Sequence, residues 1–263
     1  HINDLLNHML NIIFYQINIF GQGFPLIVLW LVSAAVFFTC YLGFINIRGF
    51  SKAISIVSGK NGKSSGLGEI SHFQALSTAI SGTVGVGNIG GVAVAISIGG
   101  PGAAFWLFMA GFLGMSTKFV ECTLGVKYRR HNPDGSVSGG PMYYLERYLL
   151  DRGFPQLGKL LGGFYALALV IGCFGIGNMF QSNQAYVQVL GITGGENSFF
   201  ADKGWLFGLL LGGAVAAVII GGIRSIASVA SKIVPFMAVL YVFSAVLIIA
   251  MSSEHVVGAI TLI

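Results

Sequence analysis

The chain has 263 residues, of which 55% are hydrophobic and only 9% are charged. Soluble globular domains carry about 25% charged residues, so this composition excludes a water-soluble globular protein and indicates a chain embedded in a lipid bilayer. The net charge of +5 does not indicate nucleic-acid binding. Nucleic-acid binders cluster Lys and Arg on one face or stripe, whereas in this chain the Lys and Arg residues concentrate in alternate loops between apolar stretches.

The first predicted element is an interfacial N-terminal helix over residues 1–24, in which apolar residues recur at helical spacing with Asn, Gln and His between them. These apolar residues are Leu5, Leu6, Met9, Leu10, Ile13, Phe14 and Ile17. An ordinary helix packed on the membrane spans would show the same pattern. Because the chain begins at His1 without a Met or a basic start, we expect the natural N-terminus to be missing or altered.

Six apolar stretches follow, and each is long enough to cross about 30 Å of hydrocarbon at 1.5 Å per residue. They cover residues 25–45, 73–98, 103–126, 160–190, 205–222 and 233–251. The sequence therefore predicts an all-α membrane protein with about six transmembrane helices. The three cysteines, Cys40, Cys122 and Cys173, lie inside apolar runs without paired spacing and indicate packing residues.

Loops rich in Lys and Arg alternate with loops poor in them along the six spans. The loops after the first, third and fifth spans are basic, whereas Lys203 is the one basic residue of the opposite loops. The basic loops contain Arg48, Lys52, Lys60 and Lys63, then Lys127, Arg129, Arg130, Arg147, Arg152 and Lys159, then Arg224 and Lys232. Cytoplasmic loops carry the excess of Lys and Arg, so we predict a cell inner (plasma) membrane protein with its N-terminus outside.

The spans are expected to group as one extra helix followed by five core helices. Residues 25–70 would form the extra transmembrane helix and a cytoplasmic loop, and residues 71–263 would form the first five-helix repeat of a transporter core. Five is an odd number, so a second copy would be inserted upside down, and inverted repeats of this kind recur among transporters. No second copy is visible, and we therefore expect the chain to be the N-terminal half of a transporter.

The second span contains the glycine-rich segment 81–91, with the sequence SGTVGVGNIGG. Each glycine costs about 1 kcal/mol in a helix relative to Ala. Small-residue helix packing uses four-residue spacing, whereas these glycines lie around more than one face. We predict an unwound helix whose carbonyls ligate sodium and whose following amides hold a carboxylate. Asn88 would supply an oxygen ligand or orient the unwound strand, and an interhelical hydrogen bond is the alternative.

The fourth span is unusually polar over residues 175–184, and intramembrane polar residues tend to face a cavity. Gln181 could therefore hydrogen-bond a substrate amine or carboxylate. The alternative is a structural hydrogen bond between helices near the outer end of the span. Asn178 and Asn183 are weaker candidates of the same kind. Lys118 and Glu121 lie three residues apart, which predicts a pair on one helix face, either structural or part of a gate.

An enzyme is not supported, because the sequence shows no nucleotide-binding loop, Cys–His pair or carboxylate dyad. His72, at the start of the second span, could relay a proton, but an interfacial histidine is the more ordinary interpretation. The segment 138–147 predicts a turn that leads into a short amphipathic cytoplasmic helix.

Several motifs together resemble the alanine or glycine:cation symporter family, over most of the chain from the first span onward. They are FQAL (73–76), GNI (87–89), GGPGA with FW (99–106), KFVECTL (118–124), VKYR (126–129), GGPMYY (139–144), GNM with Gln181 (177–181) and VPFM (234–237). The resemblance implies a fold similar to the leucine-transporter class, with two inverted five-helix repeats and the first helix of each unwound. Members of the family are roughly twice as long as this chain, in agreement with the half-transporter expectation.

Residues 84–88 also resemble the unwound stretch of sodium:neurotransmitter symporters, and this resemblance implies roles by position. The amides of Val86 and Gly87 would meet the substrate carboxylate, which Gln181 would approach from the fourth span. The Thr83 carbonyl and the Asn88 side chain would ligate one sodium ion. The carbonyls of Ser81 and Val84 would ligate a second sodium ion.

One residue departs from the pattern of the family, because many alanine symporters carry Thr or Ser where this chain has Val86. The substitution removes a hydroxyl group near the expected substrate and therefore affects which amino acid the site would prefer.

The preferred prediction is a secondary active symporter that couples inward sodium movement, or proton movement, to uptake of alanine or glycine. Its expected partners are a small neutral amino acid, sodium and the bilayer, with no organic cofactor and no nucleic acid. A passive channel or facilitator, or a non-transporting receptor subunit, is the alternative.

Overall fold

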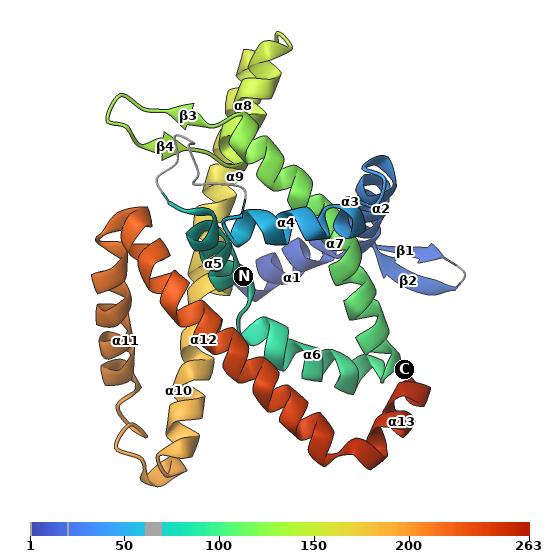
Figure 1. Cartoon of the computed structure of the whole chain (residues 1–263), viewed down its shortest axis with the longest axis vertical. Coiled ribbons are helices and arrows are strands. Elements are labelled where there is room, and N and C mark those ends of the chain that lie inside the picture. Colours follow the sequence, from blue (N-terminus) through green and yellow to red (C-terminus); the bar gives the residue numbers. More distant parts are fainter. Residues whose placement is uncertain (1, 20, 61–69) are drawn as a thin grey trace. The chain divides into compact units, whose positions relative to one another are not determined.

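The structure is a computed structural model that describes residues 2–19, 21–60 and 70–263, so the predicted loop residue Lys63 lies outside the described residues. The chain forms two units, one made of residues 1–53 and 105–123 and the other of residues 54–104 and 124–263. Helices dominate both units, as expected for the fold class (Figure 1). The described residues also contain two short antiparallel hairpins, which the all-α prediction did not include.

The first unit contains an N-terminal helix, a hairpin and the helices around the first apolar stretch. Its elements are α1 (Ile2–Ile13), β1 (Gln16–Ile19), β2 (Gln22–Pro25), α2 (Leu26–Tyr41), α3 (Ile45–Arg48), the start of α4 (Phe50–Val57) and most of α7 (Gly102–Lys127). Gly43 and Phe44 both have positive φ, and this left-handed turn ends the helix that was predicted to reach residue 45.

The predicted helix over residues 1–24 is wrong beyond Ile13, because the chain then enters the β1–β2 hairpin. Ile17 pairs with Phe24 in the antiparallel register of this hairpin. Apolar and polar residues alternate along QINI, which is the period of a strand, and Gly21 adopts a φ of +79° at the reversal. The helical spacing of the earlier apolar residues therefore stops short of Ile17.

A small set of polar residues joins α2 and α3 to α7 within the first unit. The buried Thr39 hydroxyl shares a hydrogen bond with Ser116 (3.0 Å) and lies 2.8 Å from the Ala35 carbonyl oxygen. The Asn46 amide donates to the Phe112 carbonyl oxygen at 3.2 Å. Hydrogen bonds of this kind between helices in a membrane contribute about 0.6–2 kcal/mol. Small polar residues therefore connect these helices.

The second unit contains an interrupted helix, a helical hairpin and the three C-terminal helices. Its elements are the end of α4, α5 (His72–Thr83), α6 (Val86–Gly99), the end of α7, β3 (Arg130–His131), β4 (Val137–Ser138), α8 (Pro141–Asp151), α9 (Pro155–Gly172), a π-helix (Cys173–Met179), α10 (Phe180–Ile192), a 3-10 turn (Gly195–Asn197), α11 (Gly204–Ile219), α12 (Gly222–Met251) and α13 (Ser253–Leu262).

A capping box begins α5, in which the Ser71 hydroxyl accepts from the Gln74 amide and the Gln74 side chain accepts from the Ser71 amide. The helix then packs on α12. Ala227, Ala230 and Val234 are buried on one face of α12, at spacings of three and four residues. Small side chains therefore let the two helix backbones approach closely.

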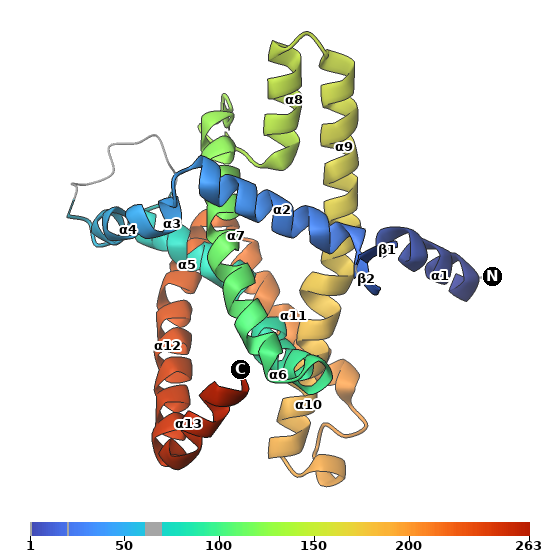
Figure 2. The same ribbon diagram turned by 90° about the vertical axis from the view of Figure 1, so that its right-hand side faces the viewer.

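The helices α8 and α9 form a tight antiparallel hairpin (Figure 2). Gly140, with a φ of +125°, precedes Pro141, so the predicted turn into a short helix is confirmed. Gly158 and Gly162 of α9 are buried against the α8 backbone. A Cβ atom on Gly158 would lie 2.8 Å from the Glu146 carbonyl oxygen, and one on Gly162 would lie 2.9 Å from the Met142 carbonyl oxygen.

Within the described ranges, three helices are long and apolar enough to cross a membrane, and the bent pair α5 and α6 gives a fourth candidate. The three are Gly102–Lys127, Pro155–Gly172 and Gly222–Met251. The first and fifth predicted spans coincide with shorter apolar helices, Leu26–Tyr41 and Gly204–Ile219. The structure therefore supports a membrane-embedded helical protein, and the count of six spans stays a prediction.

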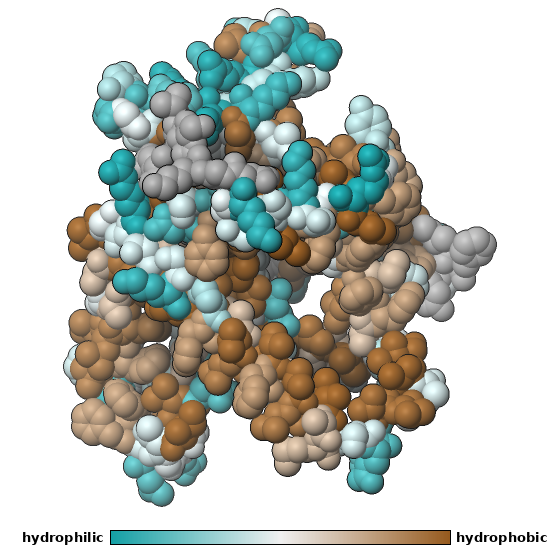
Figure 3. Space-filling view, viewed as in Figure 1, coloured by the Kyte–Doolittle hydropathy of each residue, from teal (hydrophilic) through white to brown (hydrophobic). Residues whose placement is uncertain are grey.

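Apolar side chains in the second unit face outward along the long helices. Val239, Phe243 and Ile249 of α12 are all exposed, as are many large hydrophobic residues of α9 and α11. Figure 3 shows hydrophobic residues over the lower half of α12 and hydrophilic residues over β3, β4 and α8. An outward apolar surface of this extent is unfavourable in water and favourable against lipid.

Candidate functional site

The helix of the second predicted span is interrupted inside the glycine-rich segment. α5 ends at Thr83, α6 begins at Val86, and the two helices are bent by 43° relative to each other. Val84 and Gly85 lie between them in extended conformation. The last bond of α5 runs from the Val84 amide to the Ile80 carbonyl oxygen (2.8 Å). The interruption expected from the glycine pattern is therefore present.

The Gln181 side chain reaches the interruption from α10. Its carboxamide oxygen accepts a hydrogen bond from the Val86 amide at 3.2 Å, and this bond is partly buried. In a continuous helix the Val86 amide would instead donate to the Gly82 carbonyl oxygen. Two residues predicted for the substrate site, 95 positions apart in the chain, are thus brought together.

Gly85 makes this contact sterically possible. A Cβ atom at position 85 would lie 2.7 Å from Gln181 Nε2 and 3.3 Å from Gln181 Oε1. The backbone of Gly85 is extended, a conformation open to any residue, so the need for glycine comes from the close approach and not from φ. The glycine-rich sequence therefore provides the interruption and also the space that the glutamine side chain occupies.

A π-helix over Cys173–Met179 leads directly into the turn that carries Gln181. The Asn178 side-chain amide donates to the Cys173 carbonyl oxygen at 2.9 Å, five residues back. The Ser182 hydroxyl donates to the Asn178 carbonyl oxygen at 2.7 Å. π-helical turns are rare and concentrate at functional sites, because they redirect the side chains that follow. This π-helix was not predicted, although the polar run with two glycines at 175–184 was its signal in the sequence.

The residues predicted to ligate sodium lie on both sides of the interruption. Ser81 and Thr83 belong to the last turn of α5, and the Thr83 hydroxyl donates to the Ala79 carbonyl oxygen at 2.8 Å. Val84 lies in the gap itself. The carbonyls of a final helical turn lack their usual partners and carry partial negative charge, equivalent to about half an elementary charge. This end of α5 therefore offers oxygen atoms suited to a cation.

Gly87 and Asn88 lie in the first turn of α6, where amide groups carry the opposite partial charge. The Asn88 amide donates to the Gly85 carbonyl oxygen at 3.0 Å. The Asn88 side chain is exposed and makes no hydrogen bond to any other residue that the structure describes. The grouping of Asn88 with the Thr83 carbonyl around one ion therefore stays a prediction.

The other polar candidates have ordinary surroundings. Lys118 Nζ lies 3.0 Å from Glu121 Oε2, and the two side chains are 52% and 43% exposed, so the predicted pair on one helix face is confirmed. His72 is the exposed first residue of α5. All three cysteines are free. The part of the chain that the structure describes contains no group of three or more His, Cys, Asp or Glu able to hold a metal ion.

Apolar helices that suit a bilayer, one of them interrupted at a polar contact, are features of a membrane-embedded helical protein. The chain belongs to the sodium:alanine symporter family, whose family model matches residues 7–263. The resemblance to alanine or glycine:cation symporters is thereby confirmed, and this family is one of transporters.

Three named relatives are between 33% and 41% identical to this chain over the aligned residues. The sodium/alanine symporter AgcS of Methanococcus maripaludis is 41% identical over 92% of this chain and 51% of its own length. The putative sodium/proton-dependent alanine carrier protein YrbD of Bacillus subtilis is 38% identical over 86% of this chain and 43% of its own length. The probable sodium/glutamine symporter GlnT of Bacillus subtilis is 33% identical over 90% of this chain and 46% of its own length. The chain spans about half the length of the curated relatives that it matches.

Proposed function

We propose that this chain forms the N-terminal half of a secondary active symporter, which couples inward sodium movement to the uptake of a small neutral amino acid, alanine or glycine. Membership of the sodium:alanine symporter family supports this function. The observation that carries it is the contact between Gln181 and the Val86 amide at the interrupted helix. The YrbD relative is named as sodium/proton-dependent, so a proton is the alternative coupling ion. The GlnT relative is named for glutamine, so an amino acid with a larger side chain is the alternative substrate.

In the proposed site, the substrate carboxylate binds the amides of Val86 and Gly87 at the N-terminus of α6. A helix N-terminus favours an anion because its first amides lack intrahelical partners and the helix dipole is positive there. Gln181 lies within hydrogen-bond distance of the same amide, so its carboxamide can contact a carboxylate bound at this point. The Val86 side chain would replace the hydroxyl group that many alanine symporters present here.

The proposed sodium sites use the α5 end of the interruption together with Asn88 from the first turn of α6. The Thr83 carbonyl and the Asn88 side chain would ligate one ion, and the carbonyls of Ser81 and Val84 would ligate a second ion. Substrate and sodium then share one unwound segment, with the carboxylate at the positive end of α6 and the cation at the negative end of α5. Each ligand therefore improves the binding of the other by the same factor, which is the requirement for coupled transport.

We also propose a leucine-transporter-like architecture with six spans, the extra helix within residues 25–70 and the first inverted repeat within residues 71–263. Cytoplasmic loops of membrane proteins carry the excess of Lys and Arg, and this tendency supports a proposed orientation with the N-terminus outside. The length of the relatives supports a second repeat that supplies the remaining half of both sites. The 263-residue chain alone is then expected not to transport, and uptake of alanine by liposomes that contain only this chain would contradict this proposal.

The test uses the full-length protein that carries this segment, reconstituted in proteoliposomes with labelled alanine outside. Accumulation with an inward sodium gradient, but not with potassium or with an imposed proton gradient, would support a sodium symporter. Accumulation driven by the proton gradient alone would assign the proton as the coupling ion. Equal, non-accumulating flux in every condition would refute coupled transport in favour of a facilitator. An absence of alanine and glycine flux would refute these substrates, and glutamine would be tested next.

A further inference from the structure

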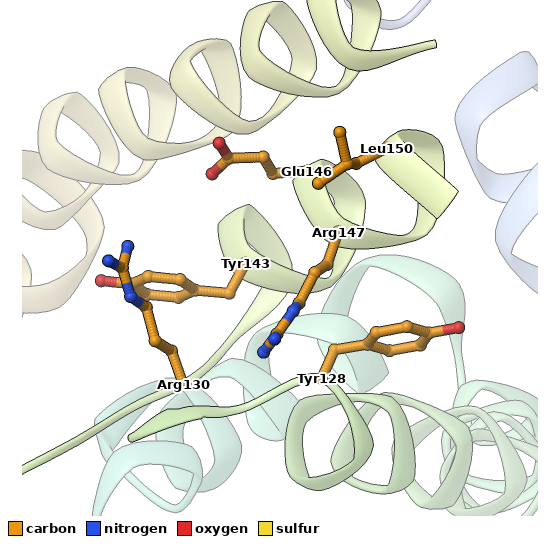
Figure 4. Close-up of a pocket in the computed structure, with 6 residues that line it drawn as sticks. All are labelled: Tyr128, Arg130, Tyr143, Glu146, Arg147 and Leu150. Atoms are coloured by element: carbon orange, nitrogen blue, oxygen red, sulfur yellow. The ribbon is translucent and has the colours of Figure 1, made fainter. Parts of the chain in front are cut away.

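A second site lies away from the interrupted helix, in the basic loop region of the second unit. A pocket of about 310 Å³ opens between the end of α7, the strand β3 and the helix α8. It is lined by Tyr128, Arg130, Tyr143, Glu146, Arg147 and Leu150 (Figure 4). None of these residues belongs to the proposed substrate or sodium site, so the pocket is separate from the proposed transport site.

Two arginines from different elements point into this pocket. Figure 4 shows the guanidinium groups of Arg130, from β3, and Arg147, from α8, directed into the space between the two elements. Arg147 Nη1 donates to the Arg129 carbonyl oxygen at 3.3 Å, which ties α8 to the strand. A guanidinium has five N–H donors, so this single bond leaves most donors of Arg147 available. Neither guanidinium forms an ion pair with a carboxylate among the residues that the structure describes.

The β3–β4 hairpin fixes the position of Arg130, which pairs with Ser138. At the turn, the Asn132 side-chain amide donates to the hydroxyls of Ser136 and Ser138, both at 2.9 Å. The Ser136 hydroxyl and amide both donate to Asp134 Oδ1, at 2.6 and 2.9 Å. These two bonds, led by the hydroxyl bond, hold the pKa of the Asp134 carboxyl below its ordinary value. The hairpin is thus tied together by its own side chains and presents Arg130 in a defined direction.

The charge around the pocket is positive. Six basic residues and three acidic residues lie between positions 127 and 159. Glu146 is the one acidic residue that lines the pocket, and its carboxylate is turned away from the Arg147 guanidinium (Figure 4). A pocket lined by two arginines and surrounded by an excess of positive charge selects an anion, and the planar guanidinium matches a phosphate group in particular.

We propose that this pocket binds a phosphate-bearing anion, and that its source is the headgroup of an anionic phospholipid in the cytoplasmic leaflet. The pocket adjoins the end of α7, one of the helices long enough to span the bilayer, so it lies where lipid headgroups are expected. Tyr128 and Tyr143 in its wall are residues typical of the membrane interface, and Leu150, which also lines the pocket, is exposed. Basic pockets at the cytoplasmic ends of membrane helices are suited to anionic headgroups. This proposal does not rest on the transport function.

The test measures lipid binding directly on the purified chain in detergent, by titration with phosphatidylglycerol and native mass spectrometry. The pocket variant is Arg130→Gln/Arg147→Gln. Each basic residue near an anionic headgroup contributes on the order of a fivefold gain in affinity, so the expected loss is about thirtyfold. The matched control, Arg152→Gln/Lys159→Gln, removes the same charge from two residues of the second unit that do not line the pocket. Its expected effect is less than about threefold, since salt screens exposed charges that do not contact the headgroup.

Two further arms separate the outcomes. Inorganic phosphate at millimolar concentration is added as a competitor; no displacement supports the lipid headgroup, whereas displacement that Arg130→Gln/Arg147→Gln abolishes would assign the site to free phosphate. The Arg130→Lys/Arg147→Lys variant keeps the charge and loses the planar fork, so we expect a loss between those of the other two variants. It also serves as the test if the Gln pair fails to fold. Equal losses in the pocket and control pairs, or no preference for phosphatidylglycerol over phosphatidylcholine, would overturn the proposal.

Discussion

The contact between α8 and α9 makes a quantitative prediction about one glycine. Gly158→Ala would place a methyl group 2.8 Å from the Glu146 carbonyl oxygen and 3.2 Å from its Cα atom. Both atoms belong to the backbone, so the helices must separate to relieve the overlap. Overpacking of this kind costs about 1–3 kcal/mol. The loss is partly offset because Ala is favoured over Gly in a helix interior by about 1 kcal/mol.

Gly163→Ala is the matched control, because Gly163 lies in the same helix and a Cβ atom there meets no atom within 4 Å. Both variants receive the same gain in helix propensity, so the difference between them isolates the steric cost. We expect Gly158→Ala to unfold at a lower temperature than Gly163→Ala by roughly 2–12 °C, from a steric cost of about 1–3 kcal/mol and a shift of about 2–4 °C per kcal/mol. Thermal unfolding of the two purified variants in one detergent measures this difference. Equal midpoints would refute the close α8–α9 packing.

Three more predictions concern the interrupted helix in the full-length protein. Gly85→Ala should displace the Gln181 side chain and weaken alanine binding by about twofold to tenfold, the value of one hydrogen bond. Gly91→Ala, where a Cβ atom meets nothing within 4 Å, should bind alanine normally; equal effects of the two variants would exclude the steric explanation. Asn178→Ala removes the side-chain bond to the Cys173 carbonyl oxygen and should weaken alanine binding several-fold, whereas Asn183→Ala, which lies outside the π-helix, should not; unchanged binding by Asn178→Ala would separate the π-helix from the site. Replacement of sodium by potassium should lower alanine affinity in an equilibrium binding assay, and equal affinity in both salts would refute coupling.

The membrane character and the interruption could be predicted because both depend on local composition. The third predicted span, 103–126, differs from α7 (Gly102–Lys127) by one residue at each end, since a long apolar run has little freedom in a bilayer. The glycine pattern predicted a break without fixing its place, and Val84 and Gly85 form it. Gln181 was identified as a polar residue in an apolar span, a signal that needs no tertiary information.

Other features depended on contacts or turns that the span pattern did not reveal. The N-terminal helix was extended past Ile13 because apolar residues at helical spacing continue into QINI, where a period of two also fits. The first span was extended to residue 45 because the left-handed turn at Gly43 and Phe44 lies inside an apolar run. The Gly158 contact needs α8 as a partner, and the pocket around Arg130 needs the β3–β4 hairpin.

The bond between Gln181 and the Val86 amide has a consequence for ligand exchange under the proposed function. An amide donor without an acceptor inside a membrane costs several kcal/mol, and the glutamine side chain removes this cost. A carboxylate that arrives at the same amide takes the place of the carboxamide oxygen, and the released Gln181 side chain then donates a hydrogen bond to the bound carboxylate, which is the bond that Gly85→Ala would remove. At the Val86 amide itself the gain is the difference between a charged and a neutral acceptor, and release of the substrate leaves no unpaired donor behind. A carrier must let its substrate go on the far side of the membrane, and a side chain that competes for the same amide lowers the barrier to that step.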